Sequence, residues 1–434
     1  MTGSNIFQRL CVLFVIVVLG VWSGVCLRGS RSVVFGSGGI IVVQAGQSIA
    51  QALNAASTGD TIFIKNGIYV QSLIVVNTSV SIVGESVEGT LVDGGSSALV
   101  IFEVVADDVL IENLTLQNTS LDPLAQAPGV RFYGVGGARM LNVTVRNAGC
   151  GVEIRSSNFT QVDQCRIIGC SSMGINLHEG SSNNVIVGNT IQNNSRGIVF
   201  ADMSSQFNRV FHNNFQNNTI QVYSLGGVNY FDAGYPAGGN YWSDFSSVDL
   251  KSGSGQDQSG SDGIFDQGFS LDVYPLVNPI TNLDIRVNEQ VYLVQASTNT
   301  IATRADFVVS TKSLDLHVIP AQDRASSLRV EIPKNLLSCA DSADWIVTFQ
   351  GNSSTPLQYL GIAGAENTYL YFKYNGMEEG EIQITGTTLF PELSPLALTA
   401  ILVVFALFLS ILKGSHLRVE SFSKPQRRNC SLGH

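Results

Sequence analysis

Two neighbouring segments carry polar side chains at matching positions: Glu153 and Arg155 in Gly-Val-Glu-Ile-Arg, and Asn176 and His178 in Gly-Ile-Asn-Leu-His. Alternate side chains of an extended strand point to the same face. If the two segments are paired strands, a carboxylate, a guanidinium, an amide and an imidazole share one surface, about 4.8 Å apart from strand to strand. Such a set suits the hydroxyl groups of a sugar. The alternative is a solvated face with ordinary cross-strand pairing.

Carboxylates near this surface raise the question of bond cleavage. Glycoside hydrolysis needs two carboxyl groups about 5 Å or about 6.5–9.5 Å apart, whereas a lyase needs a base, usually with Ca²⁺ holding uronates. Glu153, Glu179 and Asp202 are the catalytic candidates, but the sequence fixes no diagnostic spacing between any two of them. We therefore expect binding without catalysis, with a polysaccharide lyase or glycoside hydrolase as the alternative.

Aromatic side chains that could stack on sugar rings come later in the chain. Tyr241 and Trp242 lie together in Gly-Asn-Tyr-Trp-Ser-Asp, after Tyr223 and Tyr230. Because each ring combines a large apolar face with a polar edge, Tyr241 and Trp242 join the predicted ligand-binding set. Their alternative role is a hydrophobic lid that closes the end of a domain.

An Asp-rich loop is the metal candidate. The segment Asp-Gln-Ser-Gly-Ser-Asp-Gly-Ile-Phe-Asp resembles a Ca²⁺ loop, in which alternating oxygen ligands precede a glycine that permits a sharp turn. It departs from that pattern by one extra residue and by Gly or Ser at one ligand position. We predict that calcium binds Asp257, Asp262 and Asp266, to which Asp244 and Asp249 could add ligands. The alternative is a solvated acidic loop.

Internal repetition predicts the fold. Five short motifs share a central apolar residue with spacings of 29, 22, 24 and 24 residues: Leu116, Val145, Ile167, Ile191 and Phe215. A second apolar column follows about seven residues later, with spacings of 23, 23 and 22: Val152, Ile175, Ile198 and Ile220. Units of this length that alternate without a helical period are typical of a stacked solenoid. We predict an all-β chain with a parallel β-helix over residues 40–245, in which stacking builds one continuous core.

A turn residue follows each central apolar position of the first column by two places. These residues are Asn118, Asn147, Gly169, Asn193 and Asn217. Asn and Gly tolerate a left-handed backbone conformation, so we predict a sharp bend there in every coil. Stacked asparagine side chains can also hydrogen-bond from coil to coil. The alternative is a ligand or glycan role, and eight Asn-x-Ser/Thr sequons between Asn77 and Asn352 permit glycosylation.

The N-terminal part of the repeat carries a family resemblance. Residues 48–56 form an amphipathic pattern that predicts a short capping helix. Gly-Asp-Thr-Ile-Phe-Ile-Lys-Asn-Gly-Ile-Tyr (59–69) and Ser-Ile-Val-Gly-Glu (81–85) follow. This order resembles the start of the pectin-lyase-like right-handed β-helix, and in particular the NosD-like surface proteins of archaea, which carry a carbohydrate-binding and sugar-hydrolysis repeat domain. Together with residues 239–244, 262–266 and 272–276, the resemblance covers roughly residues 40 to 280.

The NosD-like resemblance also raises copper handling as a second alternative function. Copper sites use His, Met or Cys clusters. His178, His212 and His317 lie far apart in the sequence, so we do not expect such a cluster. Cys150, Cys165, Cys170 and Cys339 match no metal-site spacing either, and either one disulfide or buried free thiols would account for the first three.

The remaining segments frame the repeat. Residues 246–282 form the Asp/Gly-rich junction, and residues 283–388 resemble the small β-sandwich that precedes the anchor of archaeal surface proteins. Arg9 and the apolar run after it, within residues 1–28, predict a signal peptide or an N-terminal anchor. Residues 393–412 predict one transmembrane helix, and the basic tail at 413–434 places that tail in the cytoplasm and the ectodomain outside.

Composition supports a β-rich protein with many turns. Only 13% of residues are charged and the net charge is −10, against about 25% charged residues in an average domain. An acidic chain with few Lys and Arg lacks the charge for nucleic-acid binding. The terminal segments, the β-helix resemblance and the polar rows together predict a cell-surface module that binds carbohydrate or an envelope polymer. A purely structural or adhesive role would require no ligand.

Removal of calcium tests the loop hypothesis. If Asp257, Asp262 and Asp266 bind Ca²⁺ and order the junction, a chelator should lower Tm and increase protease cleavage between residues 240 and 280. Unchanged Tm and unchanged cleavage would show that the loop is merely solvated.

Overall fold

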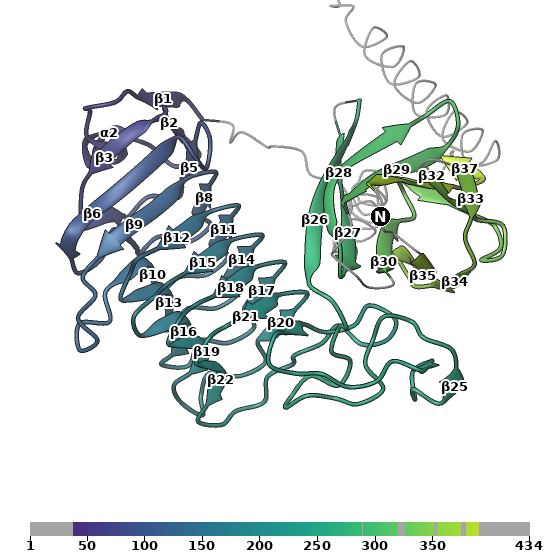
Figure 1. Ribbon diagram of the computed structural model, residues 1–434. Coiled ribbons are helices and arrows are strands. Elements are labelled where there is room, and N and C mark those ends of the chain that lie inside the picture. The colour runs from purple at the N-terminus through teal and green to yellow at the C-terminus, as the bar shows by residue number, and fades with distance from the viewer. Residues whose placement is uncertain (1–37, 289, 320–325, 351–353, 375–378, 390–434) are drawn as a thin grey trace, which may run out of the picture.

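The computed structural model describes residues 38–288, 290–319, 326–350, 354–374 and 379–389 (Figure 1). The predicted signal segment at 1–28, membrane helix at 393–412 and basic tail at 413–434 lie outside these ranges. Within the described ranges, no helix is long and apolar enough to span a lipid bilayer.

Residues 40–242 wind into a parallel β-helix, and successive coils contribute strands to three parallel sheets in turn (Figure 1). Sheet 1 contains β1 (Ile40–Val43), β2 (Thr61–Ile64), β5 (Ser81–Gly84), β8 (Leu110–Glu112), β11 (Arg139–Leu141), β14 (Gln161–Asp163), β17 (Val185–Val187) and β20 (Arg209–Phe211). Sheet 2 contains β3 (Gly67–Val70), β6 (Thr90–Ala98), β9 (Thr115–Thr119), β12 (Thr144–Arg146), β15 (Arg166–Ile168), β18 (Thr190–Gln192), β21 (Asn214–Gln216) and β23 (Tyr241–Trp242). Sheet 3 contains β4 (Ile74–Val76), β7 (Phe102–Val104), β10 (Pro128–Tyr133), β13 (Cys150–Arg155), β16 (Met173–His178), β19 (Arg196–Phe200) and β22 (Ile220–Ser224).

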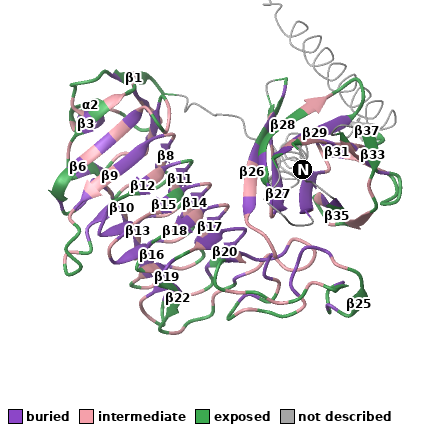
Figure 2. Cartoon of the chain, in the orientation of Figure 1, coloured by how far each residue is buried: buried purple, intermediate pink, exposed green. Residues whose placement is uncertain are grey.

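Inward-facing apolar side chains stack in columns along the β-helix and form its core. Figure 2 shows buried residues on the strands throughout the stack. The first predicted column is confirmed, because the parallel register aligns its five members on sheet 2 and all are fully buried. On sheet 3 the column through Val152, Ile175 and Ile198 is also confirmed. Its predicted last member, Ile220, is wrong: Val222 pairs with Ile198, and Ile220, two residues earlier, pairs with Arg196 and is 41% exposed.

The predicted left-handed turns are confirmed. The five turn residues after sheet 2 have positive φ angles between 52° and 68°: Asn118, Asn147, Gly169, Asn193 and Asn217. A second set after sheet 1 has the same conformation, with φ between 49° and 68°: Asn113, Asn142, Gln164, Gly188 and His212. A third set lies in the turn before sheet 1, with φ between 56° and 69°: Asp108, Gly137, Phe159, Asn183 and Phe207. Each of these coils therefore bends sharply at three fixed corners.

Buried asparagines directly after these corners connect the coils. The backbone N–H and the Nδ2 group of Asn184 both donate to Oδ1 of Asn208 at 2.9 Å, and Asn208 repeats the arrangement toward Asn229 at 3.0 Å. Matching bonds run from Asn189 to Asn213 and on to Asn240, and from Asn194 to Asn218. The predicted contact between exposed turn residues is longer, at 3.5 Å from Asn147 to Asn118. The buried neighbours thus supply most of the coil-to-coil hydrogen bonds.

Apolar caps close both ends of the β-helix core. The predicted N-terminal helix is present as α2 (Ile49–Ala55), with Ser48 as its N-cap and with Ile49 and Leu53 buried in the core. At the other end, the indole of Trp242 stacks on Phe215 at a centroid distance of 4.5 Å, and its Nε1 donates to Asp272 at 2.9 Å. Burial raises the pKa of Asp272 to about 7. Without such caps, the last coil would expose its apolar interior to water.

Two antiparallel sheets follow the β-helix and share one hydrophobic core. Sheet 4 contains β26 (Ile280–Val287), β27 (Gln290–Thr298), β30 (Ser326–Pro333), β35 (Asn367–Tyr374) and β34 (Tyr359–Ala363). Sheet 5 contains β28 (Ile301–Val308), β29 (Ser313–Ile319), β36 (Gly380–Thr385), β32 (Ile346–Gln350) and β33 (Ser354–Pro356). Two short pairs complete the described strands: β24 (Lys251–Ser252) with β25 (Gln258–Ser259), and β31 (Leu337–Ser338) with β37 (Thr388–Leu389).

Substitution of the corner asparagines tests the role of the left-handed turns. Asn147 and Asn193 have φ angles of 52° and 56°, so replacement by Gly should cost little. Replacement by Val should lower the free energy of unfolding by about 1–3 kcal/mol, because a β-branched residue is strained in this conformation. Thermal or denaturant unfolding of both variants measures the difference. Equal losses for Gly and Val would contradict the assignment.

Candidate functional site

The outer face of sheet 3 carries a register-fixed row of polar side chains. As predicted, Glu153 pairs with Asn176 and Arg155 pairs with His178 across the parallel strands β13 and β16. The row through Glu153 extends in both directions along the stack: Glu103, Arg131, Glu153, Asn176, Val199 and Tyr223. A second row contains Tyr133, Arg155 and His178.

Glu153 is the centre of an ion and hydrogen-bond network. Its Oε2 accepts from Nε of Arg131 at 2.5 Å, and its Oε1 lies 2.8 Å from Nε2 of His178. Arg131 also reaches Glu103 at 3.3 Å. Burial alone would raise the pKa of Glu153, but the hydrogen bonds from His178 and Arg131 outweigh it and lower the pKa below its ordinary value. Glu153 is therefore ionised at neutral pH, with both of its oxygens engaged.

The other two catalytic candidates are also held as anions. Arg155 forms a two-pronged ion pair with Glu179, with both N–O distances at 2.8 Å, and lowers the pKa of that carboxyl. Asp202 accepts from the backbone N–H of Glu179 at 2.5 Å and from Ser204 and Ser205. Burial opposes ionisation of Asp202, but these hydrogen bonds prevail and lower its pKa to about 2. The structure thus brings the three carboxylates into one region of sheet 3 and its following turns.

Asn176 differs from its charged neighbours because the oxygen of its amide lacks a hydrogen-bond partner among the described residues. The residue is only 6% exposed, and Oδ1 has no hydrogen-bond partner among the described residues. In the neighbouring strand β19, the guanidinium of Arg196 lies over the ring of Tyr223 at 5.4 Å, and Nε of Arg196 is likewise buried and unpartnered within the described part of the chain. A buried polar group without a partner costs about 1–3 kcal/mol. Both atoms are closed to solvent, so a ligand could supply partners and recover this free energy only after nearby side chains rearrange.

The aromatic candidates separate into core and surface groups. Trp242 is 2% exposed and its ring is packed between core residues, so it has the alternative role of a lid and its faces are closed to a ligand. Tyr241 is half-buried beside it. Tyr133 and Tyr223, on the outer face of sheet 3, are 44% and 41% exposed. Tyr133 also stacks against Arg155 at 5.0 Å.

The Asp-rich loop uses its carboxylates as backbone acceptors. Asp262 is buried and accepts from the backbone N–H of Ile264, whereas Asp266 accepts from Leu250 and Lys251. Asp257 is exposed. Asp249 accepts from the N–H groups of Asp262 and Gly263, and burial raises its pKa to about 6.

No group of three or more His, Cys, Asp or Glu within the described ranges is placed to share a metal ion. The structure therefore does not bring Asp257, Asp262 and Asp266 together, and calcium binding stays a prediction. The three histidines of the copper alternative are also apart: His178 contacts Glu153, His212 contacts Gln295 and His317 contacts Glu379. The four described cysteines are free.

Sequence reasoning missed the coil that precedes the predicted site. Arg131 and Tyr133 lie in Pro-Gly-Val-Arg-Phe-Tyr (128–133), and Glu103 lies one coil earlier. This segment has the same Gly-apolar-polar-apolar-polar order as the two segments that follow it. Extending the second apolar column back by 22 residues, from Val152 to Val130, would have found Arg131 and Tyr133.

Comparison with known proteins agrees with this architecture. Residues 77–235 match the family model described as "Right handed beta helix region". The stack and this match together define a right-handed parallel β-helix. No curated protein sequence matches the chain.

Several solved structures are similar in fold. The pectate lyase Pel9A is 16% identical, with a TM-score of 0.39, over 52% of this chain and 74% of that one. A GH87 α-1,3-glucanase catalytic domain in complex with tetrasaccharides is 16% identical, with a TM-score of 0.37, over 50% of this chain and 40% of that one. The alginate lyase from Paenibacillus sp. str. FPU-7 is 14% identical, with a TM-score of 0.31, over 48% and 82%. This chain thus spans less than half of the glucanase domain, and such low identities concern the fold alone.

Replacement of Arg131 tests the network around Glu153. Arg131→Met removes the guanidinium but keeps an apolar stem of similar length, so Glu153 loses its closest charged partner. We expect the free energy of unfolding to fall by about 1.5–3 kcal/mol, the range for hydrogen bonds to charged groups. The matched control is Arg166→Met, at an exposed position of sheet 2, which should change stability by less than about 0.5 kcal/mol. Equal effects of the two substitutions in denaturant unfolding would contradict the network.

Proposed function

We propose that the outer face of sheet 3 binds an extended carbohydrate without cleaving it. The observation that carries this proposal is the register-fixed row of polar side chains on this face, which leads through Asn176 and Val199 to the exposed ring of Tyr223 beneath the guanidinium of Arg196. The C-terminal segment at 393–412 would hold the module at the cell surface, as the sequence predicts.

The chemistry of this patch suits a sugar. Oδ1 of Asn176 needs a donor, which a hydroxyl group supplies, and Nε of Arg196 needs an acceptor, which a ring or hydroxyl oxygen supplies. The free face of Tyr223 offers apolar contact to the carbon side of a pyranose. Because the coils are stacked in register, the ligand-binding residues predicted from sequence, Glu153, Arg155 and His178, lie on the same face and extend the surface along the stack.

The protonation states on this face argue against hydrolysis. A glycoside hydrolase needs one carboxyl group whose pKa is raised so that it stays protonated and can donate to the leaving oxygen. On sheet 3 the environment does the opposite, because it lowers the pKa values of Glu153, Glu179 and Asp202. All three are anions at neutral pH, and none is prepared to act as the acid.

One contact favours a lyase as the second candidate. Nε2 of His178 lies 2.8 Å from Oε1 of Glu153, and a base oriented by a carboxylate is a recurrent arrangement for proton abstraction. In that case Arg155 on β13, or Arg131 on the neighbouring strand β10, would face the acidic group of a uronate. Because a lyase cleaves by elimination, this candidate requires that unsaturated sugars are released.

Glycan binding by the ectodomain is the test. A glycan panel should give weak binding, with Kd on the order of 10⁻⁴ M or weaker, and no release of reducing ends or unsaturated sugars. Asn176→Leu should weaken binding about tenfold, because one hydrogen bond is lost, while leaving Tm unchanged or higher. Tyr223→Ala should also weaken binding.

The matched control is Tyr230→Ala, at an equally exposed tyrosine that pairs with Arg209 on the sheet 1 side. It should bind normally. Product formation that Glu153→Gln or Asp202→Asn abolishes would overturn the proposal in favour of an enzyme. Neither binding nor turnover on the whole panel would leave an envelope structural role.

A further inference from the structure

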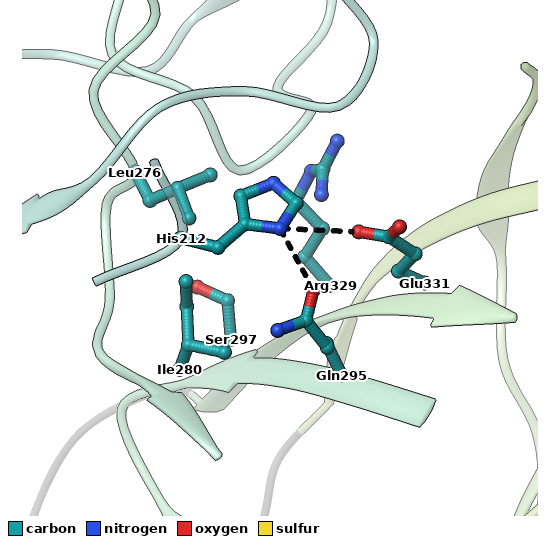
Figure 3. Close-up of a pocket in the computed structure, with 7 residues that line it drawn as sticks. All are labelled: His212, Leu276, Ile280, Gln295, Ser297, Arg329 and Glu331. Carbon is teal, nitrogen blue, oxygen red and sulfur yellow. Dashed lines mark hydrogen bonds and ion pairs between the residues drawn. The ribbon is translucent and has the colours of Figure 1, made fainter. Parts of the chain in front are cut away.

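A buried histidine lies at the junction between the β-helix and sheet 4. His212 occupies the left-handed corner after β20, with φ at 55°, and is 2% exposed. Figure 3 shows its ring facing Gln295 and Glu331, which come from strands β27 and β30. The remaining residues around this pocket are Leu276, Ile280, Ser297 and Arg329.

His212 belongs to a hydrogen-bond chain that ends on a backbone carbonyl at each side. Nε2 of His212 lies 2.9 Å from the carbonyl oxygen of Ala237. Nδ1 lies 2.7 Å from Oε1 of Gln295. Nε2 of Gln295 then donates to Oδ1 of Asn282 at 2.7 Å, and Nδ2 of Asn282 donates to the carbonyl of Gly188 at 2.9 Å. The chain therefore links two segments of the β-helix part through the first two strands of sheet 4.

The direction of every bond in this chain is fixed by its ends. A carbonyl oxygen only accepts, so Asn282 must present its NH₂ group to Gly188 and its oxygen to Gln295. Gln295 must then present its oxygen to His212. On the other side, Ala237 also accepts. Both ring nitrogens of His212 therefore face acceptors, and only a doubly protonated imidazole donates at both.

A buried carboxylate balances the charge of this imidazolium. Oε2 of Glu331 lies 3.7 Å from Nδ1 of His212, while its Oε1 accepts from Asn367 at 2.5 Å. The other charged group that lines the pocket is Arg329, also on β30. Its guanidinium donates to the carbonyl of Pro236 and lies over the ring of Tyr369 at 4.7 Å. Arg329 is thus directed toward the loop, and Glu331 faces the histidine.

We propose that His212 is held as an imidazolium and forms a proton-dependent joint between the β-helix and sheet 4. Deprotonation removes one of its two donated hydrogen bonds and leaves the Glu331 carboxylate without its nearest counter-charge. Free imidazole titrates near pH 6.5. The contribution of the joint is therefore complete below that pH and is lost as the pH rises above it.

The protonation state is measured directly by ¹⁵N NMR of the histidine ring in the full ectodomain, with His212→Gln used to assign the signal. We expect both ring nitrogens of His212 to carry protons at pH 7. A neutral ring with a single protonated nitrogen at pH 7 would overturn the proposal.

Hydrogen exchange measures the consequence for the joint. Between pH 6 and pH 9, the protection factors of β26 and β27 in the wild type should fall by about tenfold or more, the effect of losing one charged hydrogen bond. His212→Gln is a mild replacement, because Gln164 occupies the equivalent left-handed corner two coils earlier. Since Gln cannot donate at both ends, this variant should have low protection that does not change with pH. His317→Gln, at the histidine paired with Glu379 on the two-sheet part, is the control and should behave like the wild type. A pH-dependent loss that persists in His212→Gln would assign the effect to other groups and contradict the joint.

Discussion

Coil-to-coil hydrogen bonding at the corners of the β-helix is the constraint on which the rest of the structure depends. Each coil bends at left-handed residues, and a buried asparagine next to the bend bonds to its counterpart one coil away. Because side chains alternate between two faces of a strand, a slip of one residue would move every core side chain outward. The asparagine pairs fix the register against such a slip. The apolar columns inside the β-helix and the polar rows on its outer faces both follow from this register.

The same register determines which polar side chains on the outer face of sheet 3 have partners and which do not. Along the coils of Glu103, Arg131 and Glu153, opposite charges alternate and form ion pairs, and His178 contacts Glu153 from the following coil. In that following coil the row continues with Asn176, and in the next two coils with Val199 and Tyr223, so no charged side chain follows Glu153 in the row. At this end of the row, Oδ1 of Asn176 and Nε of Arg196 have no partner among the described residues, and Tyr223 is exposed. In the proposed function, this row, whose charges are largely paired, is used for recognition of a polar polymer and not for chemistry on it.

Much of the stack could be predicted from sequence because it depends on local periodicity. Three features follow from the repeat: the two apolar columns, the left-handed corners at Asn147 and Asn193, and the pairing of Glu153 with Asn176. The capping helix follows from its own short amphipathic pattern. The last coil was misjudged at Ile220, since the repeat changes there and Val222 turns inward instead. Partners that depend on contacts far apart in the chain were not predictable, such as Arg131 bridging Glu103 and Glu153 or His212 meeting Gln295 from 83 positions away. Trp242 shows the same limit, because its burial depends on Asp272, Phe215 and Phe231, which no local pattern connects.

A crystal structure of the protein bound to an oligosaccharide from the glycan panel would show directly whether the outer face of sheet 3 is the binding surface. The account predicts an intact chain along the outer face of sheet 3, with a sugar hydroxyl about 2.7–3.2 Å from Oδ1 of Asn176 and a ring against Tyr223. It also predicts that the ion pairs of Glu153 and Glu179 stay in place. A sugar bound elsewhere on the molecule, or a cleaved chain beside Glu153, would contradict it.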